Sequence, residues 1–302
     1  MLKYFIIITI LLTNIFAFDA FISSSELKTA LNNKNLIIID VTDKDIYKKG
    51  HIQNAINADI SNFISKDINT NPEDAQKQNN KIDIASDNTI QKELRALGIN
   101  NTSKVVIYHH NTKDAMAKSA YLAFILIYSG FEDVSILDGG YMEWVFQNQI
   151  LVSTKKTKNI KYGDIKITPR KELFVNTNYI KENLSKVKIL DARSYQEYFG
   201  IIKSDKINEF GHIPKASNSF YKDNFFTDDI LRPQQELNTI YINGHELLRD
   251  NEVIIYADNI LNASMEWFIV YKKMNFKNAK IYKNSLLEWV NEKNKLTRFK
   301  WE

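Results

Sequence analysis

Residues 36–55 read LIIIDVTDKDIYKKGHIQNA, and the same order of features returns in residues 188–216. The second stretch begins KILDARSYQEYFG and, after an insertion, ends EFGHIPKA, so that Asp40 matches Asp191. Each stretch combines an apolar run with a later Gly-His-Ile triplet, which indicates a strand followed by a turn that enters another strand. The matched aspartates lie 151 residues apart, so the repeating unit has the size of a domain and not of a short structural motif.

Two further matches follow in the same order along the chain. VVIYHHN at residues 105–111 matches VIIYADN at residues 253–259, and Trp144 matches Trp289, each directly after a glutamate. Matches that keep one order over so long a distance predict two copies of one domain. The spacing between copies drifts only slightly, as expected where loops gain or lose a few residues.

Strands and helices alternate within each copy. In the first copy we predict strands at residues 36–41 and 104–110, a helix over residues 113–130 that stops at Gly130, and a strand and turn at residues 134–140. This alternation is typical of a parallel sheet with helices on both faces, because parallel strands need long crossover connections. The sequence therefore predicts an α/β fold with two domains, each a mainly parallel sheet flanked by helices.

A segment of distinct composition separates the two copies and indicates the domain boundary. Residues 153–170, STKKTKNIKYGDIKITPR, are rich in lysine, weakly apolar, and contain Gly163 and Pro169. Such a stretch predicts an interdomain linker. We therefore expect a first domain at residues 21–152 and a second domain at residues 171–302.

The first residues have the pattern of a secretory signal. Lys3 precedes an apolar run from Tyr4 to Leu12, and Ala17 offers a small residue for cleavage. Residues 1–17 therefore predict a signal peptide and a periplasmic or otherwise extracytoplasmic mature protein. An uncleaved membrane anchor is the alternative, but Thr13 and Asn14 interrupt the apolar run before it reaches the roughly 20 residues that span a bilayer.

Composition excludes several classes of function. The 40 basic and 36 acidic residues give a net charge of +4 without any lysine-arginine block, which argues against a nucleic-acid binder. The chain contains no cysteine, so disulfides, thiolate metal sites and a cysteine nucleophile are all excluded. We expect no cofactor, and no membrane contact after signal cleavage.

The quoted segments resemble tandem rhodanese-type sulfurtransferases over roughly residues 21–290. The landmarks that carry the resemblance in the second copy are Asp191-Ala192-Arg193, Glu197-Tyr198, Gly211-His212-Ile213-Pro214, Tyr256 and Glu288-Trp289. The first copy keeps Asp40, Tyr47, Gly50-His51-Ile52, Asp138-Gly139-Gly140 and Trp144. Each motif is weak alone, whereas their order and duplication make the resemblance specific.

The resemblance implies sulfur transfer through a cysteine directly after the strand that ends at Tyr256. In that family the cysteine carries sulfur as a persulfide between a donor, such as thiosulfate or mercaptopyruvate, and an acceptor. Backbone N–H groups of the loop and the following helix stabilise the thiolate and an anionic donor. In this chain the corresponding residue is Ala257, which cannot carry sulfur.

The rest of this loop also departs from the family pattern. It contains no glycine, so we expect strain at Ile260 if that residue takes a positive φ, a conformation that Asn259 or Asn262 adopts more readily. Asp258 adds a negative charge where an anionic donor would approach. Two like charges about 4 Å apart cost about 1 kcal/mol in water and about 4 kcal/mol near a protein surface.

The sequence therefore favours an inactive relative that binds a small molecule or partner protein in the cleft between the domains. The predicted binding residues are Asp258, Asn259, Ile260, Leu261, Asn262 and Arg193. One alternative is a sulfurtransferase whose cysteine has been replaced by Ala257. Another is a metal-binding periplasmic protein that uses His109, His110 and Asp114.

Four further polar residues of the two copies have structural interpretations. We expect Asp191 and Arg193 to form an ion pair that fixes the loop between them and the next helix. His51 and His212 occupy equivalent turns and are expected to be satisfied locally rather than to bind metal.

Overall fold

The computed structural model describes residues 18–65, 83–112, 114–148, 151–155, 157, 160–204 and 207–302. The predicted signal peptide at residues 1–17 lies outside these residues, and export therefore stays a prediction. Within the described ranges, no helix has both the length and the apolar character needed to cross a membrane.

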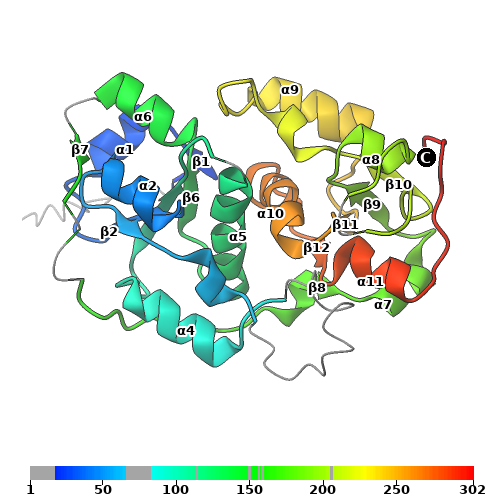
Figure 1. Ribbon diagram of the computed structural model, residues 1–302, viewed down its shortest axis with the longest axis horizontal. Helices are drawn as coiled ribbons and strands as arrows, with labels where there is room; N and C mark the ends of the chain where they lie inside the picture. Colours follow the sequence, from blue (N-terminus) through cyan, green and yellow to red (C-terminus); the bar gives the residue numbers. More distant parts are fainter. Residues whose placement is uncertain are drawn as a thin grey trace, which may run out of the picture.

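Two five-stranded parallel sheets form the framework, one in each half of the chain (Figure 1). The first has the order β1 (Phe21–Ile22), β6 (Val134–Leu137), β5 (Lys104–Tyr108), β2 (Leu36–Asp40) and β4 (Ile56–Asn57). The second has the order β8 (Phe174–Val175), β12 (Ala279–Tyr282), β11 (Val253–Tyr256), β9 (Lys188–Asp191) and β10 (Ala216–Asn218). Because both sheets have the same strand order, the predicted duplication and α/β fold are confirmed. A short antiparallel pair, β3 (His51–Ile52) with β7 (Val152–Ser153), lies outside these sheets.

Helices flank both sheets, as expected for parallel strands. Those of the first half are α1 (Ser24–Ala30), α2 (Lys44–Lys49), η1 (Ile60–Phe63), α4 (Asp87–Ala96), α5 (Ala115–Tyr128) and α6 (Gly140–Asn148). Those of the second half are η2 (Lys171–Leu173), α7 (Thr177–Asn183), α8 (Tyr195–Phe199), η3 (Tyr221–Asn224), α9 (Gln234–Asn238), η4 (Thr239–Gly244), α10 (Ile260–Phe268), η5 (Ile269–Lys273) and α11 (Ser285–Asn291).

The two halves meet through α5 and α10, which lie next to each other at the junction of the domains (Figure 1). Every residue of α5 except Lys118 is buried, because the helix is covered by its own sheet on one side and by α10 on the other. A helix that is apolar all round is expected to be buried in this way. Each of these helices directly follows the loop after a central strand, so the junction also fixes both loops.

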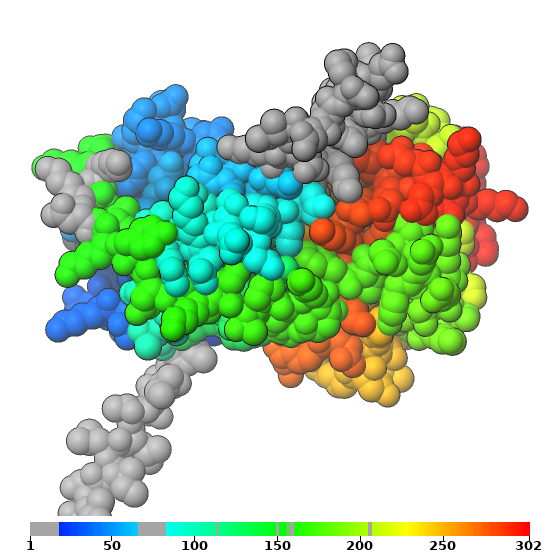
Figure 2. Space-filling view, turned by 90° about the horizontal axis from the view of Figure 1, so that it is seen from below, coloured from blue at the N-terminus to red at the C-terminus, as the bar shows by residue number. Residues whose placement is uncertain are grey.

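Aromatic rings from both halves complete one shared apolar core. Phe124 of α5 packs edge-to-face on Trp267 of α10, with ring centroids 4.8 Å apart. Phe21 makes similar contacts with Phe225 and Phe268 at 5.8 and 5.6 Å. Figure 2 shows the two halves pressed together as one body. The domains are therefore joined by a packed core rather than by the connecting chain alone.

The connecting chain between the halves follows the surface of the first domain. Ile165 is buried, and its N–H donates to the carbonyl of Ile99 at 3.2 Å. Gly163 approaches the same carbonyl so closely that a Cβ atom would lie 2.1 Å from its oxygen. Only glycine fits at this point. The lysine-rich segment is thus held in place along part of its length.

We predict that Phe124→Ala lowers the free energy of unfolding by about 3–5 kcal/mol, because it removes a fully buried ring from the core shared by both domains. Urea unfolding, followed by tryptophan fluorescence and by far-UV circular dichroism, measures the loss. The matched control is Phe146→Ala, since the Phe146 side chain is 76% exposed. Two separate unfolding transitions in the unmodified protein would contradict a shared core.

Candidate functional site

The loop after β11 places Ala257 inside the protein. Its methyl group is fully buried and belongs to the apolar core that the two domains share. Its carbonyl accepts a hydrogen bond from the backbone N–H of Leu286 at 3.0 Å. The position where the family resemblance predicts a cysteine therefore has neither a nucleophilic atom nor access to solvent.

The helix after this strand, α10, begins at Ile260, inside the stretch that the sequence analysis treated as a loop. The reason is that the side chain of Asn259 accepts the N–H of Asn262 at 3.1 Å and so caps the helix. None of residues 257–262 has a positive φ. The condition for strain at Ile260 is therefore not met, and neither Asn259 nor Asn262 adopts the left-handed conformation.

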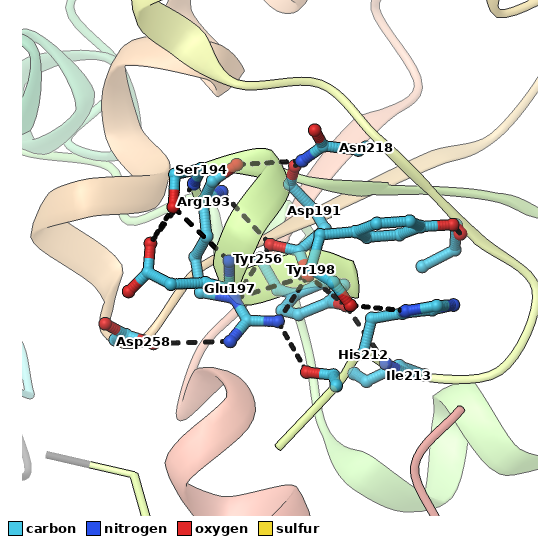
Figure 3. A network of polar contacts seen from close by, with 12 residues as sticks. Asp191, Arg193, Ser194, Glu197, Tyr198, His212, Ile213, Asn218, Tyr256 and Asp258 are labelled. Atoms are coloured by element: carbon cyan, nitrogen blue, oxygen red, sulfur yellow. Dashed lines mark hydrogen bonds and ion pairs between the residues drawn. The ribbon is translucent and has the colours of Figure 1, made fainter. Parts of the chain in front are cut away.

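Asp191 and Arg193 form a buried ion pair, as the sequence predicted, and it lies beside the end of β11 (Figure 3). Arg193 donates from Nε to Oδ1 of Asp191 at 2.9 Å and from Nη2 to Oδ2 at 2.6 Å. The hydroxyl of Tyr256 donates to the same carboxylate at 2.7 Å and accepts the N–H of Ile213 at 3.0 Å. Such a two-point contact between charged groups is strong and directional. Most of the hydrogen-bonding capacity of Arg193 therefore serves the fold.

Asp258 is the one acid of the loop and is 8% exposed. Its Oδ1 lies 3.8 Å from Nη1 of Arg193, outside hydrogen-bond distance, and has no hydrogen-bond partner among the described residues (Figure 3). Burial raises the pKa of Asp258 to about 6, although Arg193 acts to lower it. Above that pH the loop carries a negative charge, which disfavours a thiolate or an anionic donor beside it.

The equivalent loop of the first domain is arranged differently. His110 turns toward β2, where its Nε2 lies 3.1 Å from Oδ2 of Asp40, and its ring stacks on Tyr141 with centroids 3.9 Å apart. Burial acts to raise the pKa of Asp40, but the hydrogen bonds from His110 and Thr42 outweigh it and leave that pKa below its ordinary value. His110 thus takes the place that Arg193 has in the second domain, as the side-chain partner of the strand-end aspartate.

His109 points the other way, toward the second domain. Its Nδ1 lies 3.5 Å from Oγ of Ser119, and its Nε2 lies 3.7 Å from Oδ2 of Asp229. The two neighbouring histidines thus point to opposite sides, as adjacent residues at a strand end do. Across the described residues, no three histidine, aspartate or glutamate side chains gather closely enough to hold a metal ion. The metal site predicted from His109, His110 and Asp114 is therefore not assembled.

The histidines of the two Gly-His-Ile triplets have the structural role expected of them. His51 stacks on Tyr47 and His212 stacks on Tyr198, with ring centroids 3.8 and 3.7 Å apart. In each pair Nδ1 bonds to the carbonyl of the same tyrosine, at 2.8 and 2.7 Å. Burial lowers the pKa of His212. These histidines fix equivalent turns in the two domains.

One carboxyl group on α10 is fully buried, and it was not predicted from the sequence. Glu266 accepts hydrogen bonds at Oε1 from Ser219 (2.6 Å) and Tyr241 (2.8 Å), and at Oε2 from Asn224 (3.0 Å). Burial raises the pKa of Glu266 to about 7 despite these three donors. The only signal in the sequence is one acid within the apolar run MEWFIV, at residues 265–270.

A cavity of about 880 Å³ lies at the carboxyl ends of β2 and β4. Apolar side chains line it together with a few charged ones; the lining residues include Val41, Tyr47, Ile56, Ala58, Ile60, Phe63, Leu97, Ile160, Asp43, Lys48, Asp59, Glu93 and Lys118. Leu261 of α10 is the contribution of the second domain. The cavity therefore lies where the two domains meet, on the side of the first.

Of the six predicted binding residues, only Leu261 is among those that line this cavity. Asp258, Asn259 and Ile260 precede Leu261 in the sequence and are buried, and Asn262 is half-buried. Arg193 is engaged with Asp191. Whether these five residues bind a ligand stays a prediction. The cavity itself was missed, because its lining comes from turns that are far apart in the sequence.

Comparison with known proteins decides the family. The family model for the rhodanese-like domain matches residues 23–147 and residues 176–292. The chain belongs to the rhodanese family. Its two matched segments are the two sheets with their helices, so the protein is a tandem rhodanese. Because it contains no cysteine, this rhodanese lacks the thiol that carries sulfur in the cysteine-dependent sulfurtransferases.

Similar proteins include sulfur carriers and sulfurtransferases. The sulfur carrier protein TtuD of Thermus thermophilus is 26% identical over 69% of this chain and 75% of its own length. A putative thiosulfate sulfurtransferase of Saccharopolyspora erythraea is 25% identical over 90% of this chain and 93% of its own. Among solved structures, the anaerobic ergothioneine biosynthesis enzyme of Chlorobium limicola, in complex with trimethyl histidine, has a TM-score of 0.75. It is 22% identical, covers 92% of this chain and 70% of its own, and supports the fold alone.

The raised pKa of Glu266 predicts a stability that falls as pH rises. A carboxyl group whose pKa is higher in the folded state than its ordinary 4.5 favours folding fully below pH 4.5, and this contribution is lost as pH rises through about 7. The difference of pKa corresponds to about 3 kcal/mol. We expect Glu266→Gln to remove most of this dependence, because the amide stays neutral and Asn224 can reorient to accept from it.

Urea unfolding of the two proteins at a series of pH values between about 4.5 and 8 measures the effect. Glu209→Gln is the control, since Glu209 is exposed. If Glu266→Gln and the unmodified protein lose stability in parallel across this range, Glu266 does not titrate as described.

Proposed function

We propose that this tandem rhodanese is a binding protein without sulfurtransferase activity, and that it holds a small organic ligand with an apolar body in the cavity beside Leu261. The observation that carries the proposal is the cavity itself. Ligand sites in proteins usually have volumes of about 300–1,000 Å³, mostly apolar walls and a few placed polar groups. The 880 Å³ cavity has these properties.

The loop after β11 supports the loss of sulfur transfer. Ala257 is enclosed by the core, and the neighbouring Asp258 carries a buried carboxyl group. A thiolate needs positive potential or hydrogen-bond donors to form near neutral pH, and burial among apolar groups raises a thiol pKa instead. A sulfur donor would therefore meet neither a nucleophile nor an anion-binding site at this position.

The alternative function is sulfur transfer by a protein whose cysteine was replaced at residue 257. We predict no turnover for the unmodified protein and none for Ala257→Cys, because the new thiol would be buried next to Asp258. The assay transfers sulfur from thiosulfate to cyanide and measures thiocyanate. Ala257→Cys, Asp258→Gly tests whether the acid alone blocks the thiol. Turnover by the Ala257→Cys protein would favour the alternative.

Ligand binding by the cavity can be tested with an uncharged apolar probe. We expect N-phenyl-1-naphthylamine to bind with an increase in fluorescence, because its two ring systems fit a cavity of this size. Leu261→Trp and Ala96→Trp place an indole in or over the cavity and should weaken binding at least about ten-fold, which corresponds to about 1.4 kcal/mol.

Leu248→Trp is the matched control, since Leu248 is 63% exposed and is not among the residues that line the cavity. Circular dichroism checks that each variant is folded. Probe binding that is absent, or that is unchanged by both cavity substitutions, would contradict the proposed function.

A further inference from the structure

Lys118 is the single residue of α5 that is not buried. The other residues of this helix pack against the first sheet or against α10, whereas the Lys118 side chain is 27% exposed and lines the cavity. An ammonium group at this place is held by a rigid, buried helix. Lys118 therefore places a positive charge beside the apolar walls of the cavity.

Among the residues that the structure describes, the ammonium group of Lys118 has one charged partner, and the side chain of that partner is mostly exposed to solvent. Nζ donates to Oδ1 of Asp43 at 3.0 Å, and the Asp43 side chain is 76% exposed. Asp43 stands before α2 without capping it through its side chain. An ion pair with so exposed a carboxylate is weak, because water and salt screen it. An anion from a ligand can replace Asp43 at little cost.

The remaining charges of the cavity leave Lys118 as the most suitable anion partner. Lys44 and Lys48 are both exposed at the edge of α2, and Lys48 is paired with Asp45 at 2.8 Å. The carboxylate of Asp59 accepts the N–H of Ser61 at 2.9 Å. Glu93 lies on the side of the cavity shared with a second, smaller hollow. Asp59 is thus hydrogen-bonded within its own turn, and Glu93 borders the smaller hollow. Lys118 lines the larger cavity and is not among the residues of the smaller hollow.

We propose that the ligand of this cavity carries a carboxylate or sulfonate at one end of its apolar body, and that Lys118 binds that group in place of Asp43. The inference rests on the proposed function, since it assigns the ligand chemistry of the same cavity. An anion held by Lys118 is partly shielded from water by the walls, where a charge-assisted hydrogen bond is stronger than on the open surface. The apolar body then covers the floor formed by Ile56, Ile60 and Phe63.

Two fluorescent probes that differ by one group test the inference. N-phenyl-1-naphthylamine is uncharged, and 8-anilino-1-naphthalenesulfonate has the same ring system with a sulfonate. We expect the unmodified protein to bind the sulfonate about ten-fold more tightly. Lys118→Met should reduce this preference to about one-fold while binding of the uncharged probe is retained.

A second variant changes the preference in the opposite direction. Asp43→Asn removes the anion that competes for Lys118, so it should strengthen binding of the sulfonate and leave the uncharged probe unaffected. Lys280→Met is the matched control, because Lys280 is a lysine of similar exposure, paired with Glu252 at 3.1 Å, and is not among the cavity residues. It should leave the affinities for both probes as they are.

The outcomes separate the two proposals. Equal affinity for the two probes in the unmodified protein, or equal weakening of both by Lys118→Met, would overturn the role of Lys118 while the cavity still binds ligands. Failure of the uncharged probe to bind would overturn the proposed function, and the anionic ligand with it.

Discussion

The packing of α5 against α10 is the constraint on which the rest of the molecule depends. Each helix directly follows the loop after a central strand, so the contact that joins the domains also sets the position of both loops. Rings on the two helices, such as Phe124 and Trp267, make this contact dry and close. Ala257 is buried because of it, and Lys118 is left as the one partly exposed residue of α5.

Much of the fold was predictable because both copies of the domain use the same local hydrogen bonds. Tyr108 and Tyr256 each accept an N–H from the turn of the Gly-His-Ile triplet at 3.0 Å. Asn57 and Asn218 each donate to two carbonyls of the loop after the first central strand of their domain. Residues with such roles must keep their chemical type, and so the repeat is visible in the sequence.

The loop after β11 shows why local details were harder to predict. The sequence analysis treated residues 257–262 as a loop, since polar residues follow the apolar strand that ends at Tyr256. The structure instead uses Asn259 as a cap, which lets α10 begin at Ile260. Capping depends on which side chain reaches a free N–H, and a sequence with several polar residues does not specify that choice.

The cavity and Glu266 were beyond sequence reasoning for a different reason. Glu266 finds its three donors in segments about 25 to 47 residues away, and the cavity gathers turns of the first domain around one side chain of the second. No periodicity or motif records such neighbours. In the sequence, the two sites are indicated only by one charged residue within each apolar run, Lys118 in α5 and Glu266 in α10.

The two charged residues on the central helix pair differ in a way that bears on function. Glu266 is enclosed by three donors of its own domain and has no contact with solvent, so its charge acts on stability. Within the described part of the chain, Lys118 has one charged partner, the exposed Asp43, and it lines the cavity, so its charge is the one that we propose for a ligand. Asp258 makes the loop after β11 unfavourable for anions, whereas Lys118 places a positive charge at the cavity. An anion-binding role in this rhodanese is therefore compatible with the loss of the cysteine site, because the two depend on different loops.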